Sequence, residues 1–284
     1  MGIKTASPMF EESGQHLSQE RSWDFFKDSS PGHIKFLELF VQNDPSNMVL
    51  KRVLIKAYVS YAFAVHETLA LDAKLALTED LSSHREALIH YTKALDYGVD
   101  YLGKKGISRK NLLTLDDDKL MKKLKRETST DDLQGILSTA QAWGSLIQLQ
   151  KENTKLASQI SRVKILFDYV CDQDPTIEDG ACDLFYAQHS SQSKDLYLKA
   201  IAKYPKHLLV RVNYLQFVAL PSFDQEEYDK QALILKDELL KWENLNRDNL
   251  ESTSSYKGQE MLNLSNAVAK KRFEFMENHK SKIF

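Results

Sequence analysis

The sequence predicts an all-α fold of tetratricopeptide-like helical hairpins in one compact domain. Ten glycines and six prolines in 284 residues argue against an architecture of sheets and turns. Apolar residues recur at helical spacing in a central stretch: Leu156, Ile160, Val163, Phe167 and Val170. Asp174-Pro175 ends this helix, because the residue before a proline is pushed out of helical geometry. Pro175 and Pro205 lie 30 residues apart, close to the tetratricopeptide period of about 34.

Composition places the chain among water-soluble globular proteins. Hydrophobic residues make up 42% and charged residues 27%, and the net charge is -2. That balance gives no reason to expect nucleic acid or an anionic membrane surface as a partner. No apolar run approaches the roughly 20 residues needed to span a bilayer.

The first third of the chain reads as a lead-in followed by helices. Residues 1–20 are polar and aperiodic and predict a flexible N-terminal lead-in to an all-helical domain over residues 21–284. A short helix is expected over residues 32–41, ending at Asn43-Asp44-Pro45. The next helix is long and largely buried, with one stripe made of Leu50, Leu54, Ala57, Tyr61, Ala64, Val65 and Leu69.

A third helix and a charged connector follow. Ser82 and Ser83 suit an N-cap for a helix that runs to about residue 102. Residues 108–132 combine a run of three consecutive aspartates with a basic cluster and predict an exposed connector containing short helical pieces. The aspartates, residues 116–118, lack the glycine and terminal glutamate of a calcium-binding EF-hand loop, so we expect no metal there.

The last third adds further helices. A helix over residues 196–204 is broken by Pro205, and its partner continues over residues 209–218. Two more helices are expected over residues 226–242 and 259–282, and no segment predicts a strand.

Cys171 and Cys182, the two cysteines, flank the Asp174-Pro175 turn. The first interpretation is a pair of buried apolar thiols. The alternative is a disulfide, which requires an oxidising compartment. Two cysteines without a nearby histidine pattern do not predict a zinc site.

Several short motifs give the chain a resemblance to a known family. In order, they are Ala-Trp-Gly at 142–144, Arg162-Val163, Asp174-Pro175, Gly180-Ala181 and a closing helix around Ala267. Their order and spacing resemble the T-component (TatT) family associated with TRAP transporters, over about residues 23–284. The resemblance implies a periplasmic, all-helical, usually lipid-anchored protein that accompanies solute uptake.

The same resemblance implies partners and a location. The family is thought to form a homotrimer whose subunits each carry a pore or cavity and dock the TRAP substrate-binding protein, with a small hydrophobic ligand as possible guest. The membrane would be reached only through a lipid anchor missing from this chain. We therefore expect the natural gene product to begin upstream, with a signal peptide and a lipid-bearing cysteine at or just before Gly2.

Two departures from the family pattern affect these expectations. Residues 188–193 form a short segment without the usual glycine- and proline-rich loop, which puts any pore or subunit contact made by that loop in doubt. Tyr204-Pro205-Lys206-His207 replaces the double glycine usual before the following helix.

The sequence predicts a binding protein and no enzyme. It contains no GxSxG, no HExxH and no phosphate-cradling glycine loop. The eight histidines are scattered, with no pair at metal-binding spacing, so no metal or cofactor is expected. His66 lies on an alanine- and aromatic-rich helix and is either a cavity residue or an ordinary satisfied histidine.

Aromatic residues on helices of small residues are candidates for lining a ligand pocket or pore. These candidates are Tyr58, Tyr61, His66, Trp143, Phe185 and Tyr186. Trp143 is expected nearest the cavity because it lies in the best-matching motif. The alternative for each is ordinary core packing, and the alternative function is a generic tetratricopeptide-like protein–protein adaptor without a small ligand.

Overall fold

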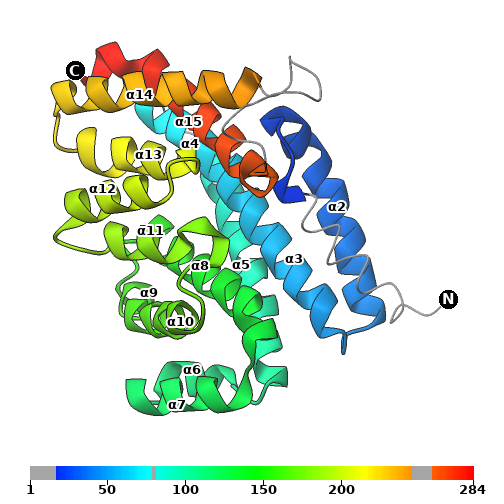
Figure 1. Cartoon of the computed structure of the whole chain (residues 1–284). Coiled ribbons are helices and arrows are strands. Elements are labelled where there is room, and N and C mark those ends of the chain that lie inside the picture. The colour runs from blue at the N-terminus through cyan, green and yellow to red at the C-terminus, as the bar shows by residue number, and fades with distance from the viewer. Residues whose placement is uncertain (1–16, 79–80, 245–257) are drawn as a thin grey trace. The chain divides into compact units, whose positions relative to one another are not determined.

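A computed structural model of the chain describes residues 17–78, 81–244 and 258–284. The described residues are 82% helical, and no strand occurs among them, so the all-α prediction is confirmed (Figure 1). No helix within them is long and apolar enough to cross a membrane. Of the expected lead-in at 1–20, positions 1–16 lie outside the described residues.

The chain divides into two compact units. The described part of unit 1 comprises residues 27–67 and 81–177, and that of unit 2 comprises residues 17–26, 68–78, 178–244 and 258–284.

Unit 1 is built around three long helices. They are α3 (Met48–Tyr61), α5 (Leu81–Lys104) and α8 (Leu133–Leu149), and each packs against the other two. A π-helical turn, η1 (Ala62–Glu67), continues α3 without a break. The remaining elements are α2 (Trp23–Asn43), which belongs to unit 1 from Lys27 onward, α6 (Arg109–Thr114), α7 (Asp117–Glu127), η2 (Thr130–Asp132), α9 (Thr154–Ala157) and α10 (Ile160–Gln173).

Helices α5 and α8 approach each other closely at Gly98. Gly98 of α5 faces Thr139 of α8, and a Cβ atom on Gly98 would lie 2.3 Å from Oγ1 of Thr139. Thr139 is fully buried, and its hydroxyl donates to the carbonyl of Gly135 at 2.7 Å. Glycine is therefore required at residue 98 because the two helices approach so closely.

Unit 2 is a succession of shorter helices. The elements are α4 (Thr68–Leu75), α11 (Ala181–Gln188), α12 (Ser193–Lys203), α13 (Leu208–Tyr214), η4 (Leu215–Ala219), α14 (Gln225–Asn244), η5 (Glu260–Leu262) and α15 (Asn263–Ile283). Helices α11 to α14 pack in sequence order, each on the next, and α15 packs against α4 and α13 (Figure 1). A 3-10 turn, η3 (Ile177–Asp179), precedes α11.

Two expected helix starts are wrong. Helix α2 begins at Trp23 instead of residue 32 and contains Pro31. Pro31 has no N–H and therefore cannot make the helical backbone hydrogen bond. The helix tolerates this loss because Ile34 and Leu37, which follow Pro31, are buried. Ser82 and Ser83 are not N-caps, since α5 already includes Leu81.

The expected exposed connector over residues 108–132 is also corrected. It folds into α6 and α7, and α7 packs on α10 with Leu120 and Leu124 fully buried. The aspartates have a structural role, because the side chain of Asp116 accepts a hydrogen bond from the backbone N–H of Lys119 at 2.9 Å and caps α7.

The cysteines follow the second of the two interpretations. Neither Cys171 nor Cys182 is free, and both are disulfide-bonded. The preferred expectation of two buried thiols is therefore wrong.

Candidate ligand site around His207

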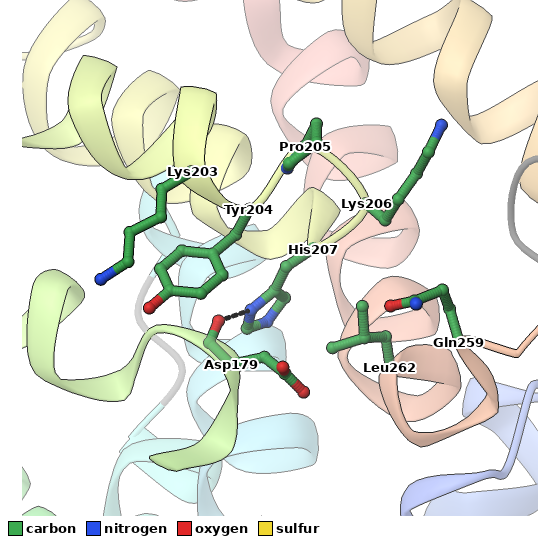
Figure 2. A pocket seen from close by; sticks show the side chains of 8 residues that line it. All are labelled: Asp179, Lys203, Tyr204, Pro205, Lys206, His207, Gln259 and Leu262. Carbon is green, nitrogen blue, oxygen red and sulfur yellow. Dashed lines mark hydrogen bonds between the residues drawn. The ribbon is translucent and has the colours of Figure 1, made fainter. Parts of the chain in front are cut away.

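A hollow of about 220 Å³ lies in unit 2, at the turn between α12 and α13 (Figure 2). Its lining residues are Asp179, Lys203, Tyr204, Pro205, Lys206, His207, Gln259 and Leu262. The hollow is smaller than the roughly 300–1,000 Å³ of sites for drug-sized molecules, so it suits a small guest.

The turn that forms one wall is held by a buried asparagine. Proline at residue 205 has no N–H to donate, and α12 ends at Lys203. Asn266 of α15 is fully buried, and its amide donates to the carbonyl of Lys206 at 3.1 Å. Its side-chain oxygen accepts from the N–H of Leu208 at 2.9 Å, which satisfies the start of α13. Both ends of the Lys206–Leu208 segment are therefore fixed.

His207 is the most distinctive group in this wall. Its side chain is buried, and its Nδ1 lies 2.8 Å from the backbone oxygen of Asp179 (Figure 2). Burial lowers the pKa of His207, and the smaller opposing effect comes from the hydrogen bond to Asp179. The ring is consequently neutral near pH 7, with its proton on Nδ1, because a carbonyl can only accept.

The remaining nitrogen of His207 is an acceptor without a partner among the described residues. This atom, Nε2, is buried. A buried polar atom without a partner costs about 1–3 kcal/mol, so a group that donates to Nε2 would be stabilised there.

Asp179, which contacts His207, belongs to a run of unusual backbone. Glu178, Asp179 and Gly180 have φ values of 49°, 46° and 117°, all in the left-handed region. A Cβ atom on Gly180 would lie 3.0 Å from the ring of Tyr204, so this ring lies directly over the glycine backbone. Conformations of this kind cost about 1–3 kcal/mol each for non-glycine residues and are common at ligand sites.

Two lysines contribute positive charge to the lining. Lys203 Nζ lies 2.8 Å from the carboxylate of Asp183, and Lys206 Nζ lies 3.2 Å from that of Glu238. The hydrogen bond that Lys203 donates to Asp183, followed by its hydrogen bond with Tyr204, raises the pKa of Lys203. The site therefore combines one buried neutral acceptor with two ammonium groups, each already paired with a carboxylate, and with Asp179 among the lining residues.

Three of the sequence-predicted residues come together in unit 1. Tyr58 is buried, donates its hydroxyl to Glu38 and stacks on Tyr97 at 6.1 Å. Tyr61 lies edge-on to His66, with ring centroids 4.8 Å apart. Burial, and then the carboxylates of Glu86 and Asp28, raise the pKa of Tyr61.

The other three lie elsewhere. Trp143 of α8 is 3% exposed, and its indole N–H donates to the side-chain oxygen of Gln159 at 3.0 Å. Phe185 is buried and Tyr186 half-buried on α11, with their rings 5.6 Å apart. None of the six predicted residues lines the hollow at His207. Their role in lining a pore or second cavity stays a prediction.

His207 was missed as a candidate, although the sequence held a signal. The segment 204–207 stood out as a replacement for a double glycine. Four larger residues in place of glycines now supply half of the lining residues of the hollow.

Comparison with known proteins tests the resemblance directly. The family model of the TRAP transporter T-component matches residues 19–236, which is more than three-quarters of the chain. No curated protein matches the chain. The family match accounts for the ordered motifs from Trp143 to Gly180 and for the all-helical structure. The chain belongs to the TRAP transporter T-component family.

Proposed function

We propose that this accessory component of TRAP-type solute uptake binds a small organic acid around His207 and docks a TRAP substrate-binding protein. The transporter association follows from the family. The ligand, the docking and a non-enzymatic role are the proposal. The main evidence for a ligand is the buried Nε2 of His207. This atom has no hydrogen-bond partner among the described residues, and His207 lines the hollow.

The lining residues indicate which chemical groups the ligand should carry. Because His207 is neutral with its proton on Nδ1, Nε2 needs a donor such as a hydroxyl group. A ligand carboxylate would take the place of Asp183 or Glu238 at the ammonium group of Lys203 or Lys206, and Leu262 offers an apolar surface. A short 2-hydroxy acid carries all three features in a molecule that suits about 220 Å³.

We further propose a periplasmic location, a homotrimer and attachment to the membrane through a lipid anchor. The family suggests a site outside the cytoplasm. Two disulfide-bonded cysteines agree with the oxidising periplasm, because cytosolic thiols are kept reduced. Light scattering tests the trimer, because the mass measured in solution should be that of three chains of 32.6 kDa each.

The alternative is a generic tetratricopeptide-like adaptor that binds a partner without any small ligand. An adaptor of this kind would bind its partner equally well with the hollow blocked. Gln259 is exposed at the lining, so Gln259→Trp places a large ring there without disturbing the core.

Calorimetric titration with a matched pair of acids tests the ligand. Lactate should bind the wild type, and propionate, which lacks the hydroxyl, should bind at least about 10-fold more weakly because Nε2 stays unpaired. In His207→Phe the two acids should bind alike and weakly. His189→Phe is the control, because His189 also contacts a backbone oxygen through Nδ1, at 2.9 Å, but is exposed.

Thermal unfolding of each variant shows whether it is folded at the titration temperature. Equal binding of lactate and propionate to the wild type would contradict the role of Nε2. Lactate binding that survives both His207→Phe and Gln259→Trp would place the ligand elsewhere.

A further inference from the structure

A second polar cluster lies in unit 1, where α3 and η1 pack against α5. His66 and His90 stack with ring centroids 5.0 Å apart and an interplanar angle of 24°. The ring of Tyr61 lies edge-on to both, 4.8 Å from His66 and 5.0 Å from His90. All three groups are partly or fully shielded from solvent.

The π-helical turn explains how His66 reaches this cluster. Residues five apart point about 140° away from each other on an α-helix. A turn closed by i→i+5 hydrogen bonds brings such residues to the same side, as the contact of Tyr61 with His66 shows. Turns of this kind within α-helices are frequent at functional sites.

Helix α5 supplies the other two groups. Glu86 and His90 are four residues apart and so lie on one face of the helix. Nδ1 of His90 lies 2.7 Å from the backbone oxygen of Glu86. A neutral His90 therefore carries its proton on Nδ1 and leaves Nε2 free to ligate.

The three side chains converge. One ligand atom from each of His66, Glu86 and His90 lies within 4.8 Å of the others. A tetrahedral ion with bonds of about 2.0–2.1 Å holds its ligands about 3.3 Å apart, so small side-chain rotations would close the set.

We propose that His66, Glu86 and His90 bind a divalent transition-metal ion of the zinc class. Two imidazoles and one carboxylate suit zinc, whereas magnesium and calcium prefer oxygen ligands alone. The bond from His90 to the backbone oxygen of Glu86 is the kind of support that fixes the tautomer and direction of a ligating histidine. Three protein ligands leave a fourth position for water or an anion.

This proposal departs from the expectation of no metal, which was based on the spacing of the histidines in the sequence. His66 and His90 are 24 residues apart in sequence, and only the packing of α3–η1 on α5 brings them together. The proposal is independent of the organic-acid site, because the residues belong to the other unit.

Zinc binding by the full chain without a histidine tag tests the proposal. After removal of metal with a chelator, titration with zinc chloride should give one site per chain, confirmed by elemental analysis after gel filtration. His90→Gln and Glu86→Gln should each weaken binding by about 100-fold or more, since even supporting partners of metal ligands contribute 10–100-fold. His84→Gln, on the same helix, is the matched control and should leave binding unchanged.

Cobalt provides a readout that does not depend on the folding of a variant. Wild-type protein with cobalt should show visible d–d absorption of a nitrogen-ligated, low-coordinate site, and zinc should displace it. Binding that is equal in His90→Gln, Glu86→Gln and wild type would overturn the assignment. Absence of both zinc binding and the cobalt spectrum in the folded wild type would overturn the site altogether.

Discussion

The imidazole ring of His66 lies on that of His90 with a centroid distance of 5.0 Å, although the two residues are 24 positions apart. A single π-helical turn produces this relationship by moving His66 to the side of Tyr61. A second polar network links the same two helices to α2, where Glu38 contacts Tyr58 of α3 and Lys93 of α5.

Glu38 should make the stability of the wild type depend on pH, and its replacement should remove that dependence. Burial on its own would raise the pKa of Glu38. Hydrogen bonds from Tyr58, Lys35 and Lys93 outweigh it and lower that pKa to about 2. A lowered folded-state pKa stabilises above the unfolded pKa of about 4.5, and this contribution is lost as pH falls toward 2.

Glu38→Gln should therefore lower the free energy of unfolding by about 2 kcal/mol at pH 7. Urea unfolding followed by circular dichroism should show the deficit shrinking between pH 5 and pH 3. The exposed Glu152→Gln is the control, with an effect within about 0.5 kcal/mol. A deficit that stays constant with pH would show that the carboxylate charge is not responsible.

The contact between α5 and α8 predicts opposite effects for two glycines of one helix. Gly98→Ala should destabilise by about 1–3 kcal/mol, because its Cβ would lie 2.3 Å from Oγ1 of the buried Thr139. Gly103→Ala meets nothing within 4 Å and should stabilise by up to about 1 kcal/mol through helix propensity. Thermal unfolding of both variants measures the difference. If Gly98→Ala proves as stable as Gly103→Ala, the close approach is not present in solution.

Two buried tyrosines should respond differently to loss of the hydroxyl. Tyr197 is fully buried, and its hydroxyl has no hydrogen-bond partner among the described residues. Tyr197→Phe should be neutral or stabilise by up to about 1 kcal/mol. Tyr101 donates to Asp132, a buried carboxylate that also pairs with Lys105 at 2.8 Å. Tyr101→Phe should cost about 1–3 kcal/mol in chemical unfolding, and equal effects of the two changes would contradict this account.

The cysteines should be unreactive until reduced. Thiol titration of the denatured chain should detect no free thiol before reduction and two thiols per chain afterwards, since both cysteines are disulfide-bonded. Protein folded under oxidising conditions is the material for this measurement. Two titrating thiols before reduction would restore the interpretation of buried free cysteines.

Helical periodicity predicted the architecture because it depends on which residues must be buried. The stripe from Leu50 to Leu69 and the helix before Pro175 were both identified from apolar spacing alone. The family resemblance was confirmed by the match over residues 19–236. No single short motif was specific to the family, but their order along the chain was informative. Local composition gave wrong predictions of helix bounds and of exposure where tertiary packing determines them. Pro31 is accommodated within α2, and the charged α7 buries Leu120 and Leu124.

The candidate sites were harder to predict because they depend on contacts between distant segments. The neutral state of His207 follows from its burial, and its proton is placed by a carbonyl 28 residues away. The group of His66, Glu86 and His90 depends on a π-helical turn, which no apolar pattern indicates. Trp143 was placed nearest a cavity from its motif, and the structure shows its indole buried and bonded to Gln159.

Docking of a TRAP substrate-binding protein is the most direct test of the proposed role. The substrate-binding protein encoded beside a TRAP permease, free of ligand and then loaded with an organic acid, is titrated into the purified chain by calorimetry. We expect a saturable complex of defined stoichiometry whose affinity changes when the acid is present and when Gln259→Trp blocks the hollow. Absence of any complex with either form of that protein would contradict the account.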